Sequence, residues 1–156
     1  MKVIIVTGTP GTGKTRLAKK IAHHKGFLYM DVNKFIKEKK LYEKYNKKSK
    51  CFDIDVRKLN KILIDKINAS KKDIVIDSHL SHYLPKEYVT KCIVTKCNLK
   101  ILKKRLEQRG YNKKKVRENL DAEIFNVCLT EAQEHGHKIL IVDCSYPFTT
   151  NVIKEL

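Results

Sequence analysis

The eight residues GTPGTGKT at positions 8–15 restrict most strongly what this chain can fold into, because they match the pattern G-x-x-x-x-G-K-[ST]. The apolar run VIIV at 3–6 comes before them, and an amphipathic helical pattern follows. Glycines let such a loop wrap around phosphate oxygens and present backbone N–H groups and a helix N-terminus to the anion. In this strand–loop–helix context the pattern predicts a phosphate-binding loop, and hence a bound nucleoside triphosphate.

The chemistry of such loops assigns roles to three residues. Lys14 is expected to reach the β- and γ-phosphates, and the hydroxyl of Thr15 is expected to ligate Mg²⁺. A second acidic group from a neighbouring strand end usually assists the metal, and Asp77 closes the apolar run DIVID at 73–77. Asp143, which ends ILIVD, is the competing candidate. We favour Asp77, because the last strand usually lies at the sheet edge in this architecture.

Strand-like and helix-like patterns alternate along the chain. Apolar strand-like runs lie at 3–6, 27–30, 74–76, 92–95 and 139–142. Helical apolar stripes lie at 17–22, 56–67, 99–106 and 116–128. Continuous apolar strands separated by helices predict a parallel sheet covered on both faces. The expected fold class is therefore α/β: a three-layer P-loop NTPase with about five parallel strands, whose ligands bind at the carboxyl ends of the strands.

Two segments interrupt this alternation and are expected to be insertions at the ligand edge of the sheet. Residues 31–54 are polar and rich in lysine, and residues 108–118 place Gly-Tyr-Asn between two helical patterns. Compact phosphotransferases need mobile segments that exclude water, so we interpret these as an acceptor-binding flap and a lid. No N-K-x-D guanine signature occurs, which argues against a GTPase. A single small kinase domain over residues 1–156 is the expectation.

Composition supports a cytoplasmic globular protein. Of the 156 residues, 42% are hydrophobic and 33% are charged, and no apolar run approaches a membrane span. The first apolar stretch is too short for a signal peptide. The five cysteines are odd in number and include no C-x-x-C, so free thiols are expected, with no disulfide-linked partner and no zinc site.

The formal net charge of +17 has two open interpretations. Only five of the 34 basic residues are arginine, and such a lysine excess fits an A/T-rich genome. Equally, it fits electrostatic attraction to polyanions such as RNA or ribosomes. The lysines have no aromatic residues interleaved among them, so the charge predicts salt-sensitive binding and no specificity.

Two arginines and two histidines near the ligand edge are candidates for phosphate chemistry. Arg105 and Arg109 lie one helical turn apart, and guanidinium groups bind phosphate in a bidentate way that lysine cannot reproduce. The alternative for both is a solvated helix face. His79 lies two residues after Asp77 and is expected to titrate near pH 6–7, with a capping role as the alternative. For His82 we favour a structural role.

The sequence resembles the atypical adenylate kinase family, which includes adenylate kinase isoenzyme six and archaeal relatives. The resemblance covers nearly the whole chain. It is carried by TGTPGTGKT at 7–15, LYEKY at 41–45, IVIDSH at 74–79 and LEQRGYNKKKVRENLDAEIF at 106–125. The last of these, with its N-x-x-x-E-I, and the Asp-x-His at 77–79 are the most specific.

The resemblance implies a nucleotide kinase with a nucleoside-monophosphate-binding part and a lid, using ATP and Mg²⁺. The implied activity is ATP + AMP ⇌ 2 ADP together with ATP hydrolysis. Relatives also assist maturation of the small ribosomal subunit and its 16S-type rRNA, through a platform ribosomal protein and pre-rRNA. The residues matched to ATP binding are Gly11, Gly13, Lys14, Thr15, Arg16 and the lid residue Arg109. Asp77 and His79 match the catalytic Asp-x-His, with Asp77 near the metal directly or through water; Asp31 and Lys37 are matched to the acceptor.

One departure matters for activity. Ordinary adenylate kinases carry an arginine just after this strand that holds the acceptor phosphate, whereas residues 77–82 here read DSHLSH. Lys37 also occupies a place where relatives often have arginine. Two alternatives therefore stay open beside the adenylate kinase: an ATP-hydrolysing ribosome assembly factor with little kinase activity, and a P-loop kinase for another small acceptor.

Overall fold

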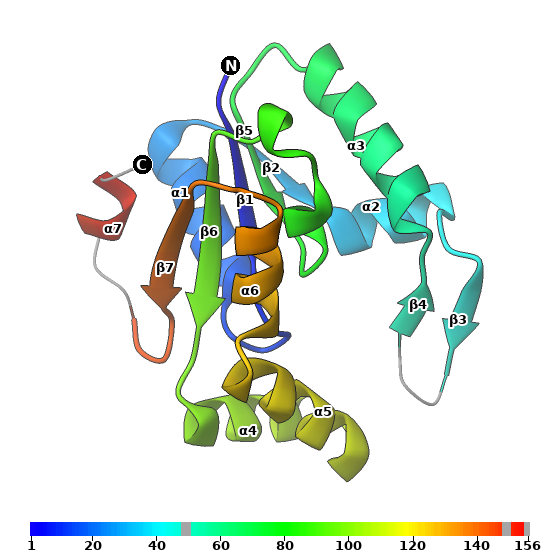
Figure 1. The fold of residues 1–156 in the computed structure, drawn as a ribbon, viewed down its shortest axis with the longest axis vertical. Helices are drawn as coiled ribbons and strands as arrows, with labels where there is room; N and C mark the ends of the chain where they lie inside the picture. Colours follow the sequence, from blue (N-terminus) through cyan, green and yellow to red (C-terminus); the bar gives the residue numbers. More distant parts are fainter. Residues whose placement is uncertain (48–50, 148–150, 155–156) are drawn as a thin grey trace.

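The computed structural model describes residues 1–47, 51–147 and 151–154 of the chain (Figure 1). Its main sheet has five parallel strands in the order β2-β5-β1-β6-β7. These strands are β1 (Val3–Thr7), β2 (Leu28–Asp31), β5 (Ile74–Asp77), β6 (Lys91–Lys96) and β7 (Ile139–Asp143). The predicted parallel five-stranded sheet is thereby confirmed, and β7 lies at its edge as expected.

Helices connect and cover these strands. The helices are α1 (Lys14–Lys25), α2 (Val32–Lys39), α3 (Val56–Ala69), α4 (Leu99–Gln108), α5 (Lys113–Ile124), α6 (Val127–Glu134) and α7 (Asn151–Lys154). Two short 3-10 turns, η1 (Ser81–Tyr83) and η2 (Lys86–Tyr88), follow β5. Among the described residues, no helix is both long and apolar enough to cross a membrane.

The central strands β1, β5 and β6 are buried on both faces of the sheet, which confirms the predicted three layers. Alternate side chains of a strand point to opposite faces, so Val3 and Ile5 of β1 join the core under α2, α3 and α6. Ile4 and Val6 of the same strand join the core under α1 and α7. Burial on both faces explains why the strands read as continuous apolar runs.

The two predicted insertions contain short elements of their own. Residues 31–54 fold into α2 and the antiparallel hairpin of β3 (Lys44–Asn46) with β4 (Cys51–Asp53), while 48–50 lie outside the described residues. Residues 108–118 comprise the end of α4, a turn with Gly110 at φ 74°, and the start of α5. These two helices pack through a separate apolar cluster that includes Leu102, Leu106 and Val116. In Figure 1 they lie at the end of the sheet to which the strand arrows point.

The apolar stripe at 116–128 is two helices, not the single helix that its spacing predicts. Helix α5 ends at Ile124, and α6 begins at Val127 after Asn126, whose φ of 53° is left-handed. Asparagine tolerates this conformation better than most residues, and it breaks a right-handed helix. Two members of the stripe on either side of this break, Ile124 and Val127, are exposed rather than buried.

The cysteines behave as predicted wherever the structure describes their side chains. Cys92, Cys97, Cys128 and Cys144 are all free thiols. Burial is the main cause that raises the pKa of each of them, so they are poor nucleophiles in the folded protein.

Candidate active site

The phosphate-binding loop runs from the end of β1 into the first turn of α1, as its sequence pattern predicts. Glycine is required at Gly8, because a Cβ atom there would lie 2.4 Å from Oγ1 of Thr95. Gly13 precedes α1 with a φ of 111°, a conformation that side chains rarely adopt. The backbone therefore forms a tight loop at the carboxyl edge of the sheet, and this loop leads into a helix N-terminus that can bind anions.

Lys14 lies inside this loop. Its ammonium group donates hydrogen bonds to the carbonyl oxygens of Gly8 at 2.8 Å and Thr9 at 3.0 Å. Burial lowers the pKa of Lys14 to about 8; the Asp77 carboxylate opposes the shift, and the guanidinium of Arg109 adds to it. Lys14, Asp77 and Arg109 are therefore close enough to influence one another, as expected of groups around one phosphate chain.

Asp77 is buried at the end of β5, where it meets Thr15 from α1. Its Oδ2 accepts hydrogen bonds from the Thr15 hydroxyl at 2.6 Å and from the phenol of Tyr29 at 2.9 Å. Burial and then this carboxylate raise the pKa of Tyr29. Hydroxyl and carboxylate oxygens are the ligands that Mg²⁺ prefers, so Thr15 and Asp77 form a donor set that fits the expected metal. Asp143, by contrast, accepts hydrogen bonds from Ser145 at the sheet edge.

His79 is half-buried beside this site, and its titration differs from the expectation. Burial, followed by the positive charges of Lys14, His82 and Lys115, lowers the pKa of His79 to about 4. The expected transition near pH 6–7 is therefore wrong, because desolvation and three neighbouring groups all disfavour the imidazolium. His79 is neutral at pH 7 and can act as a hydrogen-bond donor or acceptor.

His82 has the structural role that we favoured. Its ring is buried, with Nδ1 at 2.7 Å from Oγ1 of Thr7 and Nε2 at 2.9 Å from a carboxylate oxygen of Glu131. Nε2 of His137 donates to the carbonyl oxygen of His82 at 2.8 Å. These contacts join the loop after β5 to β1 and α6, and they fix the segment that carries Asp77 and His79.

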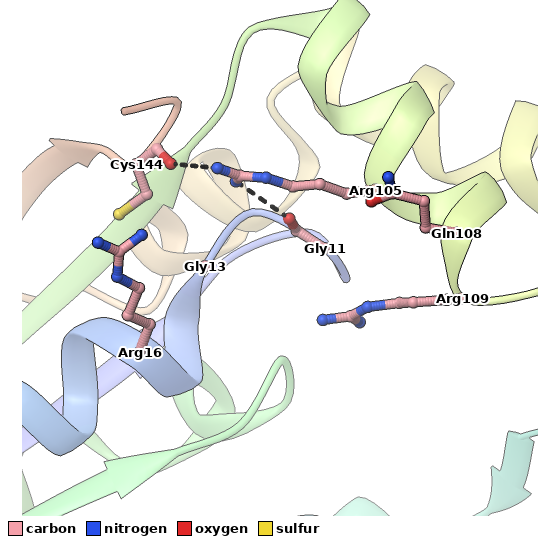
Figure 2. Close-up of a pocket in the computed structure, with 7 residues that line it drawn as sticks. All are labelled: Gly11, Gly13, Arg16, Arg105, Gln108, Arg109 and Cys144. Atoms are coloured by element: carbon pink, nitrogen blue, oxygen red, sulfur yellow. Dashed lines mark hydrogen bonds between the residues drawn. The ribbon is translucent and has the colours of Figure 1, made fainter. Parts of the chain in front are cut away.

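A cavity of about 350 Å³ opens beside the phosphate loop (Figure 2). It is lined by Gly11, Gly13, Arg16, Arg105, Gln108, Arg109 and Cys144. Three guanidinium groups thus border a space next to the loop, and such groups attract phosphate and stack on aromatic rings. The size and lining suit the nucleoside and phosphates of a bound nucleotide.

Arg105 is mainly engaged with the backbone in this cavity. Its guanidinium donates to the carbonyl oxygen of Cys144 at 2.9 Å and more weakly to that of Gly11 (Figure 2). It also donates to the carbonyl oxygen of Ser145 at 3.1 Å and more weakly to that of Thr12. The phosphate loop is thereby joined to the segment after β7. Arg109, the C-cap residue directly after α4, is exposed and remains the better candidate for a lid arginine.

The two residues predicted to bind the acceptor lie in different settings. Asp31 ends β2 in register with Asp77, and its carboxylate caps α2 by accepting from the N–H of Lys34 at 3.0 Å. It is therefore near the site but has a structural contact of its own. Lys37 lies exposed in the last turn of α2. An acceptor role for either residue stays a prediction.

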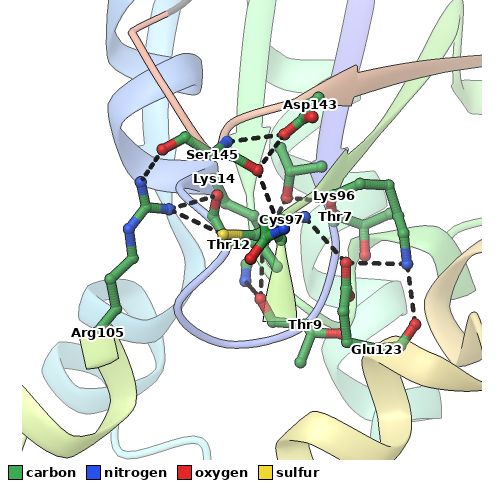
Figure 3. A network of polar contacts seen from close by, with 12 residues as sticks. Thr7, Thr9, Thr12, Lys14, Lys96, Cys97, Arg105, Glu123, Asp143 and Ser145 are labelled. Carbon is green, nitrogen blue, oxygen red and sulfur yellow. Dashed lines mark hydrogen bonds and ion pairs between the residues drawn. The ribbon is translucent and has the colours of Figure 1, made fainter. Parts of the chain in front are cut away.

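The structure adds three residues that the sequence did not single out for the site. Tyr29 contacts Asp77, and buried Lys115 lies with its ammonium 4.2 Å from the ring centre of Tyr111. Glu123 contacts Thr9 of the phosphate loop (Figure 3). Glu123 belongs to the N-x-x-x-E-I motif, so a signal for it existed. Tyr29 in an apolar run and Lys115 among three consecutive lysines had none.

The sequence of this chain is similar to those of known proteins. A family model described as an AAA domain matches residues 4–126. A "Putative adenylate kinase" of Methanocaldococcus jannaschii is 39% identical over 153 residues, covering 98% of this chain and 82% of that protein. An "Adenylate kinase isoenzyme 6 homolog" of Caenorhabditis elegans is 34% identical over 131 residues, covering 84% and 72%.

Among solved structures, the fold is similar to P-loop kinases. A shikimate kinase from Acinetobacter baumannii, in complex with shikimate, superposes with a TM-score of 0.65 at 11% identity, covering 99% of this chain and 90% of that one. A gluconokinase from Sinorhizobium meliloti 1021 gives 0.59 at 15% identity, covering 99% and 88%. Sequence and fold together show that this chain belongs to the family of the archaeal adenylate kinases and isoenzyme 6 homologues, and that it is a P-loop phosphotransferase.

Proposed function

We propose that this protein is a nucleoside monophosphate kinase that catalyses ATP + AMP ⇌ 2 ADP and also hydrolyses ATP slowly. The observation that carries the proposal is the meeting of Lys14, Thr15 and Asp77 at the carboxyl edge of the sheet, where the Thr15 hydroxyl lies 2.6 Å from the Asp77 carboxylate. The names of the relatives support adenylate as the acceptor.

The donor ATP would lie along the phosphate loop, with its nucleoside in the guanidinium-lined cavity. Backbone N–H groups of the loop and the α1 N-terminus hold the phosphates, and Lys14 and Arg109 neutralise charge on the transferring phosphoryl group. Arg16 lines the cavity from α1. Thr15 and Asp77 would hold Mg²⁺, directly or through water, where it neutralises charge on the β- and γ-phosphates. Catalysis is then mostly positioning and electrostatics, without a covalent intermediate.

The acceptor would approach from the side of residues 31–54 and His79. A neutral imidazole at His79 orients the acceptor phosphate or a water by hydrogen bonding, without the charge of an arginine. Asp31 and Lys37 would complete the acceptor site. Because residues 77–82 carry no arginine, we expect weak acceptor binding and a measurable share of hydrolysis.

The boundaries of the functional parts belong to the same proposal. One kinase domain spans 1–156, with residues 31–54 as the monophosphate-binding insertion and 108–118 as the lid. The packing of α4 on α5 and the α2–hairpin arrangement support two separate segments beside the core. We also propose a cytoplasmic location.

Two observations favour an alternative, an ATP-hydrolysing assembly factor for the small ribosomal subunit. The net charge of +17 suits contact with pre-rRNA or a platform ribosomal protein, and the missing arginine weakens the case for an efficient kinase. A P-loop kinase for another small acceptor is the third candidate.

The test is to measure ADP and inorganic phosphate formed from ATP alone and from ATP plus AMP, with Mg²⁺. An adenylate kinase forms two ADP per ATP consumed when AMP is present, at a rate many times that of hydrolysis. If AMP changes neither product and phosphate release persists, hydrolysis is the activity and the assembly factor is favoured. If ATP is not consumed under either condition, the proposal is wrong.

Three variants make the assignment specific. Lys14→Ala should abolish both reactions, and the exposed α3 substitution Lys58→Ala is the control that should change neither. His79→Ala should lower turnover roughly 10²–10⁴-fold if it positions a reacting group, with little change in ATP affinity. Loss of ATP binding in His79→Ala would contradict its placement on the acceptor side.

A further inference from the structure

Glu123 is a buried carboxylate that the phosphoryl-transfer chemistry above does not use. It lies in the last turn of α5 and is 5% exposed. Its Oε2 accepts from the Thr9 hydroxyl at 2.7 Å, and its Oε1 accepts from the N–H of Cys97 at 3.0 Å and the ammonium of Lys96 at 2.9 Å (Figure 3). Its backbone oxygen also accepts from Lys96 at 3.1 Å.

These contacts hold three parts of the molecule together. Thr9 belongs to the phosphate loop, Lys96 and Cys97 lie at the end of β6, and Glu123 belongs to the helix that begins in the predicted lid segment. An ionised carboxylate is costly to bury unless donors satisfy it, and removing one donor leaves that cost uncompensated. The three donors around the Glu123 carboxylate are therefore held in fixed positions relative to it.

Thr9 connects Glu123 to Lys14, because it forms hydrogen bonds with both residues. Thr9 is 2% exposed, and its hydroxyl donates to Glu123. The carbonyl oxygen of the same residue accepts from the Lys14 ammonium at 3.0 Å and from the Thr12 hydroxyl at 2.7 Å. A side chain that fixes the orientation of Thr9 thus fixes the carbonyl that holds the phosphate-binding lysine.

We propose that Glu123 is a positioning residue for the nucleotide site. It holds the Thr9 segment of the phosphate loop in the shape that receives the phosphates, and it ties that loop to the C-terminal end of α5. The inference rests on the proposed function, because it acts through the phosphate-binding role of Lys14. Preorganised donors need no rearrangement when the anion binds, so losing this tie weakens ATP binding without removing any group that contacts the phosphates.

The test compares Thr9→Val with Thr9→Ser. Valine keeps the shape of threonine and removes the hydroxyl, whereas serine keeps the donor to Glu123. By isothermal titration calorimetry with Mg²⁺, we expect Thr9→Val to weaken ATP binding about ten-fold, the effect of one hydrogen bond to a charged group. Thr9→Ser should stay within about three-fold of the wild type.

Thr90→Val is the matched control, because it removes a hydroxyl that accepts from the N–H of Val3 at 3.0 Å, at the other end of β1. It should lower the melting temperature and leave ATP affinity unchanged. Glu123→Gln has one acceptor oxygen instead of two for its three donors, and it should weaken ATP binding as Thr9→Val does. Equal ATP affinity in wild type, Thr9→Val and Glu123→Gln would overturn the inference.

A second measurement separates this inference from the proposed function. Amide hydrogen exchange of residues 8–13 in the nucleotide-free protein should be faster in Thr9→Val than in wild type or Thr90→Val. If the wild type binds no ATP, the proposed function fails, and loop exchange still decides whether Glu123 positions the loop. Unchanged loop exchange in Thr9→Val and Glu123→Gln would show that it does not.

Discussion

The protonation state of Lys14 affects how tightly the phosphate loop binds an anion. Its pKa is lowered to about 8, chiefly by burial, while a bound polyphosphate favours the charged form. ATP affinity should therefore fall as the pH rises through about 8, by up to ten-fold per pH unit, because binding must then take up a proton. Calorimetric titrations between pH 7 and 9.5, in buffers of different ionisation enthalpy, measure both the affinity and the proton uptake.

Lys14→Arg provides the control for this pH dependence, since arginine stays charged throughout the range. If that variant still binds ATP, its affinity should show no inflection between pH 7 and 9.5. A wild-type affinity that is constant over the same interval, with no proton uptake, would contradict the role given to Lys14.

His79 should make the protein less stable in mild acid. Its pKa is about 4 in the folded protein, against 6.5 when unperturbed, with burial as the main cause. Between these values the unfolded chain binds a proton that the folded chain does not, so stability is lost as the pH falls from 6.5 towards 4. Urea unfolding at pH 7 and pH 5 should show a larger loss of stability for wild type than for His79→Gln.

Subtracting the His79→Gln result isolates this residue, because His82 and His137, whose pKa values burial also lowers, are common to both proteins. Equal losses for wild type and His79→Gln would show that His79 is already solvated. A histidine NMR titration would then place its pKa near 6.5 instead of 4.

At the scale of elements, the junction between α5 and α6 depends on Asn126. Its left-handed φ of 53° costs most side chains roughly 1–2 kcal/mol, and glycine almost nothing. Asn126→Ala should therefore lower the free energy of unfolding by about 1 kcal/mol, whereas Asn126→Gly should stay within about 0.5 kcal/mol of wild type. Urea unfolding measures both, and equal destabilisation by alanine and glycine would mean that a side-chain contact, not the backbone, requires asparagine.

For the whole molecule, the net charge of +17 predicts that its binding to nucleic acid depends on salt and not on the nucleotide sequence. Lysine contacts to phosphate release counterions, so affinity for single-stranded RNA should fall at least about 100-fold between 50 and 200 mM salt. We expect equal affinity for a 16S-type rRNA fragment and a scrambled RNA of the same length, measured by fluorescence anisotropy. Sequence-selective binding that survives 200 mM salt would contradict this expectation and favour the assembly factor.

The sequence by itself determined the fold class and the phosphate loop. Apolar runs of the right length, alternating with helical stripes, are enough to specify a parallel sheet buried on both faces. The motif at 8–15 identified the loop, because its glycines allow a local backbone conformation that other residues rarely adopt. The order of the strands along the chain favours Asp77 over Asp143, and the observed sheet order places β7 at the edge. The apolar periodicity at 116–128 predicted one helix where the structure has two, because one left-handed residue does not disturb the spacing of apolar residues in the sequence.

Tertiary structure alone decided how the site groups influence one another. The low pKa of His79 arises mainly from burial and then from neighbouring groups, of which Lys14 and Lys115 lie far away in sequence, and no local pattern records the burial or these two contacts. Tyr29 contacts Asp77 across neighbouring strands, and Glu123 reaches a residue 114 positions away. A sequence shows which side chains can donate, accept or ionise, but desolvation and contact depend on which distant elements the fold brings together.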